Sequence, residues 1–84
     1  MAYEIILKPP AQRDLDSLPQ QEIARIAKRL ALLSTNPRPF GVQKLSDEEG
    51  YRIRSGKYRI LYEVNDRQNL VFVYRIKHRR DAYR

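Results

Sequence analysis

The sequence predicts an α+β fold in which an N-terminal strand, a helix hairpin and a three-stranded antiparallel meander build one domain. Three observations carry this prediction. The first is a run of β-forming residues before two prolines at positions 9 and 10, and the second is a repeat of apolar residues about every 3.6 positions between positions 19 and 37. The third is the alternation of side chains between two faces, residue by residue, in segments after residue 50. The meander is expected to pack on the helices, and a short basic tail follows it. A chain of 84 residues supports one modest core, so we expect a single domain over residues 1–84 with its function on an open face.

The first half of the chain contains the N-terminal strand and the two helices. The strand is expected at residues 3–8, because the prolines that follow lack the amide donor that a ladder needs. A short helix is expected over residues 10–18, ending before Pro19. The second helix lies between positions 19 and 37 and ends at Asn36-Pro37. Its apolar stripe consists of Ile23, Ile26, Ala27, Leu30 and Leu33.

The second half reads as three strands joined by short turns. The strands are expected at residues 51–55, 58–64 and 70–77, with hairpin turns at 55–57 and 65–69 and an earlier turn at Asp47 to Gly50. Gly56 lies at the centre of the first hairpin turn. The last strand is apolar on both faces at its start, which predicts a central position in the sheet.

Period-two alternation along these strands collects cations on the face of the sheet that points away from the helices. We expect Leu61, Val71 and Val73 to form a small apolar floor among those cations. The cations themselves are Arg52, Arg54, Arg59, Arg75 and Lys77.

The net charge of +7 lies entirely in the second half of the chain. Residues 1–50 carry seven cations and seven acids, whereas residues 51–84 carry ten cations and three acids. Like charges on neighbouring strands repel one another, so this half is expected to bind a polyanion. This concentration of positive charge indicates nucleic acid as the first candidate partner. An acidic protein or a membrane surface would also be complementary to the positive charge.

Composition excludes other classes of protein. The absence of cysteine excludes a disulfide framework and a thiolate zinc site, and it is typical of a reducing compartment. The single histidine and the three acids of the basic half lack the spacing of metal ligands, so we expect neither a metal nor another cofactor. The chain has no secretory leader and no apolar run near the ~18 residues of a membrane span, which predicts a cytoplasmic protein without membrane contact.

Two segments carry a resemblance to a known family. The run from Gly56 to Tyr62, GKYRILY, and the run from His78 to Tyr83, HRRDAY, resemble the RelE branch of the RelE/ParE superfamily of bacterial toxins, and the likeness extends over the whole chain. The resemblance implies a toxin of a type II toxin–antitoxin system that inhibits translation. It implies a metal-independent endoribonuclease, an mRNA interferase that cleaves mRNA in the ribosomal A site. The implied partners are a cognate RelB-like antitoxin, the ribosome and mRNA.

The same resemblance implies roles for individual residues. Arg59 would contact the scissile phosphate, Arg79 would assist the transition state, and Tyr83 would stack on a base or move a proton. The best-known family pattern has lysines where this chain has Arg52 and Arg54. The implied catalytic set is Arg52, Arg54, Arg59, Arg79 and Tyr83, and the implied RNA-binding set is Arg52, Arg54, Lys57, Arg75, Lys77, His78 and Arg80.

The chemistry of metal-free RNA cleavage leaves the general base open. Attack by the 2′-hydroxyl needs a proton acceptor, cations that stabilise the transition state, and an acid for the leaving 5′-oxygen. Arginine supplies charge but is a poor proton acceptor. The acceptor is therefore Tyr83, which we favour because nearby arginines would stabilise its phenolate, or His78, or else charge stabilisation and the ribosome carry the step.

Two other functions remain open from the sequence. One is a ParE-like inhibitor of DNA gyrase that has no nuclease activity, and the other is an RNA-binding module that lacks catalysis. A shared fold does not separate them. The implied catalytic set of Arg52, Arg54, Arg59, Arg79 and Tyr83 distinguishes them, because RNA cleavage needs these residues and binding to gyrase does not.

Overall fold

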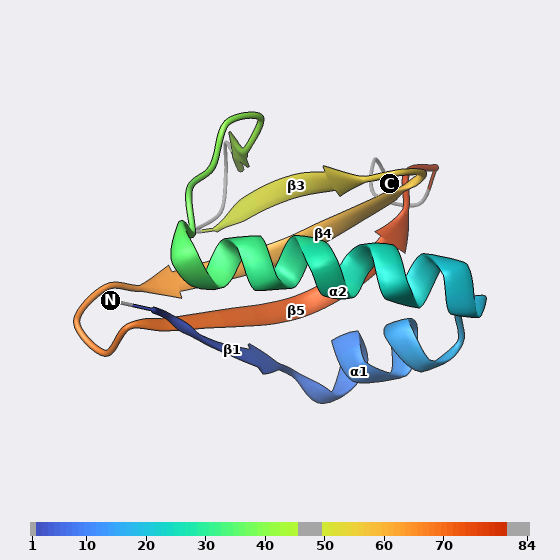
Figure 1. Ribbon diagram of the computed structural model, residues 1–84, viewed down its shortest axis with the longest axis horizontal. Coiled ribbons are helices and arrows are strands. Elements are labelled where there is room, and N and C mark those ends of the chain that lie inside the picture. Colours follow the sequence, from blue (N-terminus) through green and yellow to red (C-terminus); the bar gives the residue numbers. More distant parts are fainter. Residues whose placement is uncertain (1, 46–49, 81–84) are drawn as a thin grey trace.

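The computed structural model describes residues 2–45 and 50–80, and in this part of the chain two helices pack on a five-stranded sheet (Figure 1). The strand order is β1-β5-β4-β3-β2. This arrangement confirms the predicted α+β fold of a strand, two helices and an antiparallel meander. The elements are β1 (Glu4–Leu7), α1 (Pro9–Asp16), α2 (Gln20–Thr35), β2 (Gln43–Lys44), β3 (Tyr51–Ser55), β4 (Tyr58–Asn65) and β5 (Leu70–His78).

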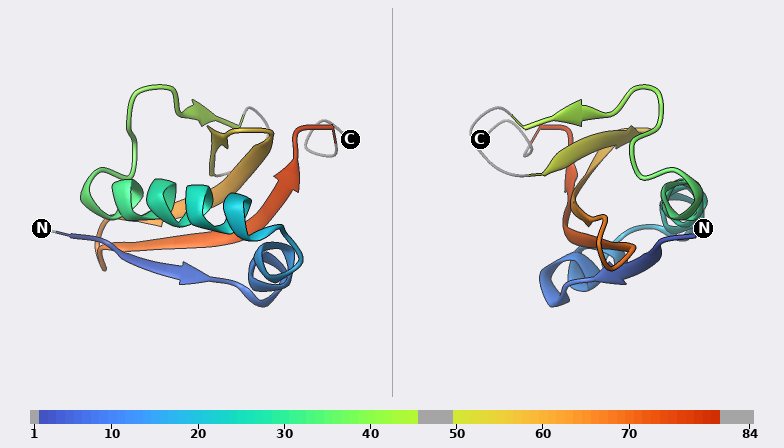
Figure 2. Two further views of the ribbon diagram at one scale, coloured as in Figure 1. Left: turned by 45° about the vertical axis from the view of Figure 1, so that its right-hand side comes forward. Right: turned by 90° about the vertical axis from the view of Figure 1, so that its left-hand side faces the viewer.

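The last strand, β5, is central in the sense that it has a neighbouring strand on each side, as its apolar start predicts. It pairs in parallel with β1 and in antiparallel fashion with β4. The parallel pairing brings the N-terminal strand beside the start of the last strand, with Ile5 opposite Val71 and Leu7 opposite Val73. Figure 2 shows α2 lying across one face of the sheet, and α1 packs beside β5.

The observed bounds of both helices lie within two residues of the predicted ones. Prolines occupy the first positions of α1, where the missing amide hydrogen has no intrahelical partner in any case. In α2 the residues that reach the core are Ile26, Leu30 and Leu33, whereas Ala27 is exposed although the predicted stripe included it. Neither helix has the length and apolarity needed to cross a bilayer.

A β-bulge in β5 changes which side chains face the helices. Leu61 lies opposite Arg75 and Tyr62 lies opposite Val73, which leaves Tyr74 as an extra residue between them. Before the bulge Val71 and Val73 are fully buried, and after it Ile76 joins the same core. The expectation that Val71 and Val73 form an exposed apolar floor is therefore wrong. Residues 70–74 are apolar throughout, so the sequence carries no sign of this change of phase.

Asp14 fastens α1 to the central strand. Its carboxylate accepts hydrogen bonds from Nε and Nη2 of Arg75, at 2.7 and 3.2 Å, and from the backbone N–H of Ile76 at 2.9 Å. Burial opposes ionisation of this carboxyl group, but the bonds from Arg75 and Ile76 outweigh it and lower the pKa of Asp14 below its ordinary value. A carboxylate of this kind stabilises the fold only while it is ionised.

We expect Asp14→Asn to lower the free energy of unfolding near pH 7 by about 1–3 kcal/mol, because the charged acceptor of three hydrogen bonds is lost. Since the folded pKa is depressed, the contribution of Asp14 is fully present above its unfolded pKa of about 4 and disappears as the pH falls through the lower folded pKa. Urea unfolding across this range measures the effect. Asp16→Asn is the matched control, since Asp16 is exposed on the same helix and accepts only from Gln12 among the bonds described. A gap between wild type and Asp14→Asn that does not narrow as the pH falls below about 4 would contradict this account.

Candidate nucleic-acid interface

A row of buried isoleucines sets the positions of the basic side chains. Ile53, Ile60 and Ile76 are cross-strand partners on β3, β4 and β5 and are 3%, 0% and 3% exposed. The next row along the same strands consists of Arg54, Arg59 and Lys77, which are also cross-strand partners. Because successive residues point to opposite faces, burial of the isoleucines directs the three cations to the face away from α2. The predicted basic face is therefore present.

Three arginines line one hollow of about 230 Å³, which we call the arginine groove and which consists of Gly41, Gln43, Arg52, Arg54 and Arg59. Arg54 is exposed, whereas Arg59 is only 4% exposed and lies deeper than its position on an open face predicted. The guanidinium of Arg52 donates from Nε and Nη2 to Oε1 of Gln43, at 3.0 and 2.6 Å. Gln43 lies directly opposite Arg52 in the β2–β3 pair, so it fixes the orientation of this cation.

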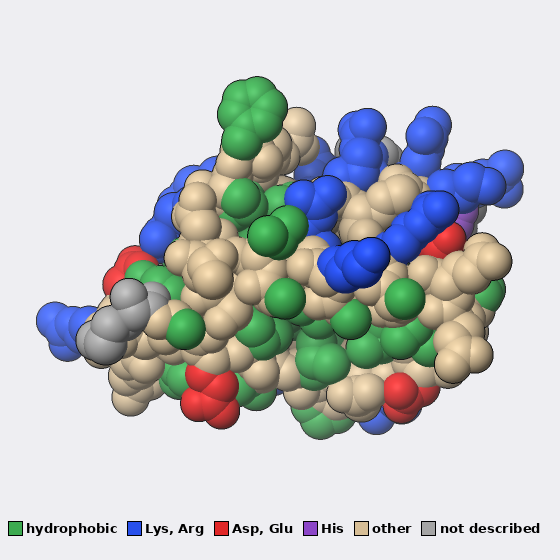
Figure 3. All heavy atoms as spheres, viewed as in Figure 1, with side chains coloured by type: hydrophobic (Ala, Val, Ile, Leu, Met, Phe, Trp, Pro, Cys, Tyr) green, Lys and Arg blue, Asp and Glu red, His purple; other side chains and the backbone are tan. Residues whose placement is uncertain are grey.

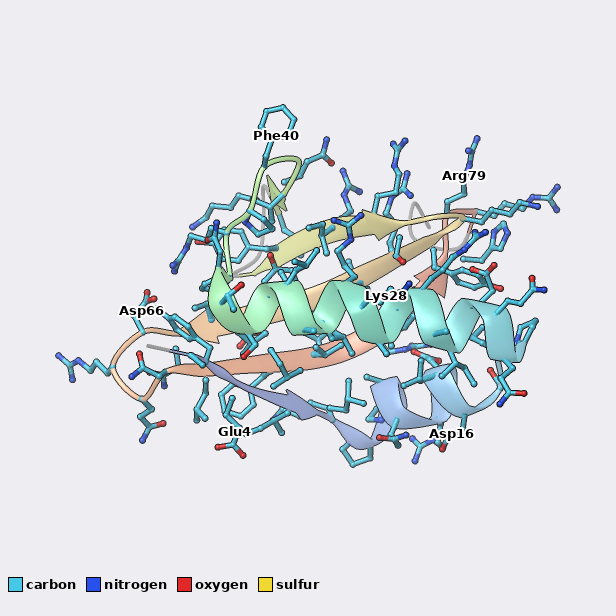
Figure 4. All side chains as sticks on the ribbon, viewed as in Figure 1. Glu4, Asp16, Lys28, Phe40, Asp66 and Arg79 are labelled. Carbon is cyan, nitrogen blue, oxygen red and sulfur yellow. The ribbon has the colours of Figure 1, made fainter. Side chains whose placement is uncertain are left out.

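A second group of basic residues lies where β5 ends. Lys57, His78, Arg79 and Arg80 surround a separate hollow, which we call the tail pocket. The backbone N–H of Arg79 donates to the carbonyl oxygen of Lys57 at 2.7 Å, and this bond holds the end of β5 against the β3–β4 turn. Figure 3 shows Lys and Arg side chains gathered on this side of the molecule, and Figure 4 shows Arg79 pointing away from the body of the protein.

His78 makes two contacts that orient its ring. The ring meets Tyr58 edge to face, with 5.4 Å between the centroids. Its Nδ1 accepts a hydrogen bond from the backbone N–H of Arg80 at 3.3 Å. In the neutral tautomer that this bond requires, the proton is on Nε2, so the outer nitrogen of His78 is a donor.

One predicted member of the basic face already has a protein partner. The guanidinium of Arg75 pairs with Asp14 of α1, which offsets part of its charge, and its role in RNA binding stays a prediction. No local pattern predicts this pair, because its partners are 61 positions apart. Tyr83 lies outside the described residues, and so does most of the turn expected at Asp47 to Gly50.

Sequence reasoning missed two members of the arginine groove, Gly41 and Gln43. They belong to the segment before β3, where β2 has only two residues and is too short to show an alternating pattern. Across residues 2–45 and 50–80, His, Asp and Glu side chains form no group of three that would ligate a metal ion.

The fold and the basic face define a small α+β protein whose sheet presents cations from three strands and from the end of β5. The chain belongs to the family described as the ParE toxin of type II toxin–antitoxin systems, whose model matches residues 5–83. Among proteins similar over their full length is the toxin RelG of Mycobacterium tuberculosis, which is 33% identical and is matched over 100% of this chain and 99% of its own.

Solved structures support the same assignment. The archaeal RelE–RelB complex from Pyrococcus horikoshii contains a chain that superposes with a TM-score of 0.82 at 29% identity, covering 94% of this chain and 97% of that one. A chain of the intact E. coli RelBE toxin–antitoxin complex superposes with a TM-score of 0.81 at 28% identity, and the match covers 92% of this chain and 96% of that one. The chain is therefore a RelE-like toxin of a type II toxin–antitoxin system, which confirms the resemblance seen in its sequence.

We expect Arg54→Ala and Arg79→Ala each to weaken binding to a single-stranded RNA oligonucleotide and to make its salt dependence shallower. A phosphate contact to single-stranded nucleic acid contributes about 0.7 to the slope of log affinity against log salt, so each variant loses about that amount. Fluorescence anisotropy from about 50 to 200 mM salt measures the slope. Arg67→Ala is the control, because Arg67 is exposed in the β4–β5 turn at the opposite end of the sheet. Equal loss of slope in all three variants would show that total charge, rather than the groove and tail pocket, binds the RNA.

Proposed function

We propose that this toxin is an endoribonuclease that cleaves mRNA in the ribosomal A site and so inhibits translation. The observation that carries the proposal is the arginine groove, in which Arg52, Arg54 and Arg59 converge from neighbouring strands on one small hollow. A groove of this kind matches the charge that develops on a phosphate during RNA cleavage. The nearly complete burial of Arg59 strengthens the match, because a cation acts more strongly on a phosphate where water is excluded.

Cleavage would proceed by attack of the RNA's own 2′-oxygen on the adjacent phosphorus. The P–O bond to the 5′-oxygen breaks, which leaves a cyclic phosphate on one fragment and a 5′-hydroxyl on the other. Arginines of the groove stabilise the added charge on the phosphate oxygens, with Arg59 as the central contact. Arg79, from the tail pocket, assists from the end of β5. The mechanism as proposed needs no metal ion.

Proton transfer needs groups other than the groove arginines. In the tautomer of His78 that its bond from Arg80 requires, the outer Nε2 already carries a proton, so it can donate a hydrogen bond to a phosphate or leaving oxygen but cannot remove the 2′-proton. This favours Tyr83 as the acceptor, which is the role already expected for it. Lys57, Lys77 and Arg80 would bind RNA around the reacting phosphate.

The partners follow from the proposed activity and from the relatives. Structural neighbours are RelE chains in complexes with RelB antitoxins, and we propose a RelB-like antitoxin for this toxin. A basic surface with a net charge of +7 is complementary to an acidic segment of such a partner. The ribosome and mRNA place the activity in the cytoplasm.

A second function has one specific observation in its favour. The matching family is described by ParE, and a ParE-like toxin would inhibit DNA gyrase without cleaving RNA. The fold is common to both activities, so it does not distinguish them. The arginine groove favours the nuclease, because an inhibitor that acts by protein contact has no need of three arginines around one hollow.

Primer extension on a translated message tests the nuclease. We expect induction of the toxin to produce cuts within translated codons, and we expect no cuts in the same message without a start codon. Arg59→Met keeps the aliphatic stem of this buried residue while removing its charge, and it should lower the cleavage rate by about 10²- to 10³-fold, as loss of one transition-state donor does. A thermal melt of Arg59→Met, which should lie near that of the wild type, separates charge loss from unfolding. Intact mRNA together with blocked gyrase supercoiling would favour the ParE-like function instead.

A second experiment assigns the proton carrier. If Tyr83 removes the 2′-proton, Tyr83→Phe should lower the single-turnover rate on ribosomes by about 10²- to 10⁴-fold with little change in ribosome affinity. If Tyr83 only stacks on a base, Tyr83→Phe keeps its activity and only Tyr83→Ala is defective. A normal Tyr83→Phe beside an inactive His78→Ala would transfer the role to His78. Normal rates in both would mean that charge stabilisation carries the reaction.

A further inference from the structure

Phe40 is the most exposed large apolar residue of the part of the chain that the structure describes. Its exposure is 103%, so its ring makes almost no contact with the rest of the protein. Figure 4 shows the ring at the tip of the segment between α2 and β2, pointing away from the sheet. A single exposed apolar residue is common in proteins, so its meaning depends on how it is held and on what lies beside it.

A hydrogen-bonded turn holds Phe40 in this position. The backbone N–H of Val42 donates to the carbonyl oxygen of Pro39 at 3.1 Å, and Gly41 between them has a φ of 92°. These are the features of a type II turn with glycine at its third position, and Phe40 occupies the preceding corner. The side chain at that corner projects outward because of the backbone conformation.

The base of the same segment is fastened to the core. The buried Tyr62 hydroxyl donates to the carbonyl oxygen of Pro37 at 2.7 Å. The Arg38 guanidinium pairs with Asp66 at 2.9 Å and donates from Nε to the Tyr51 hydroxyl at 2.9 Å. Phe40 is therefore presented to solvent by an anchored segment.

The arginine groove begins one residue after Phe40. Gly41 lines the groove together with the three arginines, and Gln43 of the same segment holds the Arg52 guanidinium. A cation-lined groove beside an exposed aromatic ring is the combination by which proteins bind single-stranded nucleic acid, with phosphates on the cations and a base on the ring.

We propose that Phe40 is a stacking platform for an unpaired RNA base whose neighbouring phosphate lies in the arginine groove. This inference rests on the proposed nuclease function and adds a base contact outside the residues that the sequence nominated. Stacking on a ring depends little on base identity, so Phe40 positions the strand in the groove rather than selecting a codon.

The absence of tryptophan from the chain allows a direct test. Phe40→Trp introduces a single indole, whose fluorescence should be quenched when a six-nucleotide oligoadenylate binds. An abasic oligonucleotide of the same length carries the same phosphates and should not quench it. Gln12→Trp, on the exposed side of α1, is the matched control and should respond to neither.

Affinity measurements on the same oligoadenylate complete the test. Phe40→Leu keeps an apolar side chain but loses the ring, and it should weaken binding by about 5- to 150-fold, whereas Phe40→Tyr should bind like the wild type. Wild-type affinity in Phe40→Leu, alongside weakened binding by Arg54→Ala, would overturn the stacking role while leaving the nuclease proposal intact. Failure of the wild type to bind the oligoadenylate at all would count against both proposals, and primer extension would then decide the nuclease separately.

Discussion

The buried isoleucine row across β3, β4 and β5 is the constraint on which the basic face depends. Burial of each of Ile53, Ile60 and Ile76 contributes about 1.5–3 kcal/mol. Like charges directly opposite one another on neighbouring strands cost only about 0.2–1 kcal/mol per pair. The free energy gained by burying the isoleucines exceeds the repulsion between the cations. Burial therefore determines which side chains face the core, and it holds Arg54, Arg59 and Lys77 side by side. The sheet thus maintains a charge density that an anionic partner relieves.

The central strand connects this face to the rest of the molecule. Ladder bonds join β5 to β1 and β4, and its bulge at Tyr74 lets both Val73 and Ile76 face the core although they are three positions apart. Beyond the bulge Arg75 is bound by Asp14, which neutralises one cation and fixes α1 at the same time. The three groove arginines and the cations around the tail pocket are the other members of the basic surface.

Much of the fold follows from local patterns in the sequence, and the differences have physical causes. The bounds of β3 were predicted correctly, and those of β1, β4, β5 and both helices were within about two residues, because each element has a clear period or a proline beside it. The bulge was not predicted, because residues 70–74 are all apolar and their pattern cannot show that the core-facing positions shift by one residue. The Asp14–Arg75 pair and the Gln43–Arg52 contact were not predicted either, because they join segments whose proximity only the folded sheet creates.

The geometry of the groove gives a physical reason for arginine, rather than lysine, at positions 52 and 54. Lysine in such a place would supply a proton acceptor only after a large loss of basicity, whereas arginine remains charged at any working pH. Arg52 is moreover held by two bonds from its guanidinium to Gln43, so it presents charge in a fixed direction. Under the proposed function, the arginines of the sheet supply electrostatic stabilisation, and proton transfer falls to His78 at the end of β5 and to Tyr83. Charge stabilisation then depends on side chains whose positions the core sets, whereas proton transfer depends on the end of the chain.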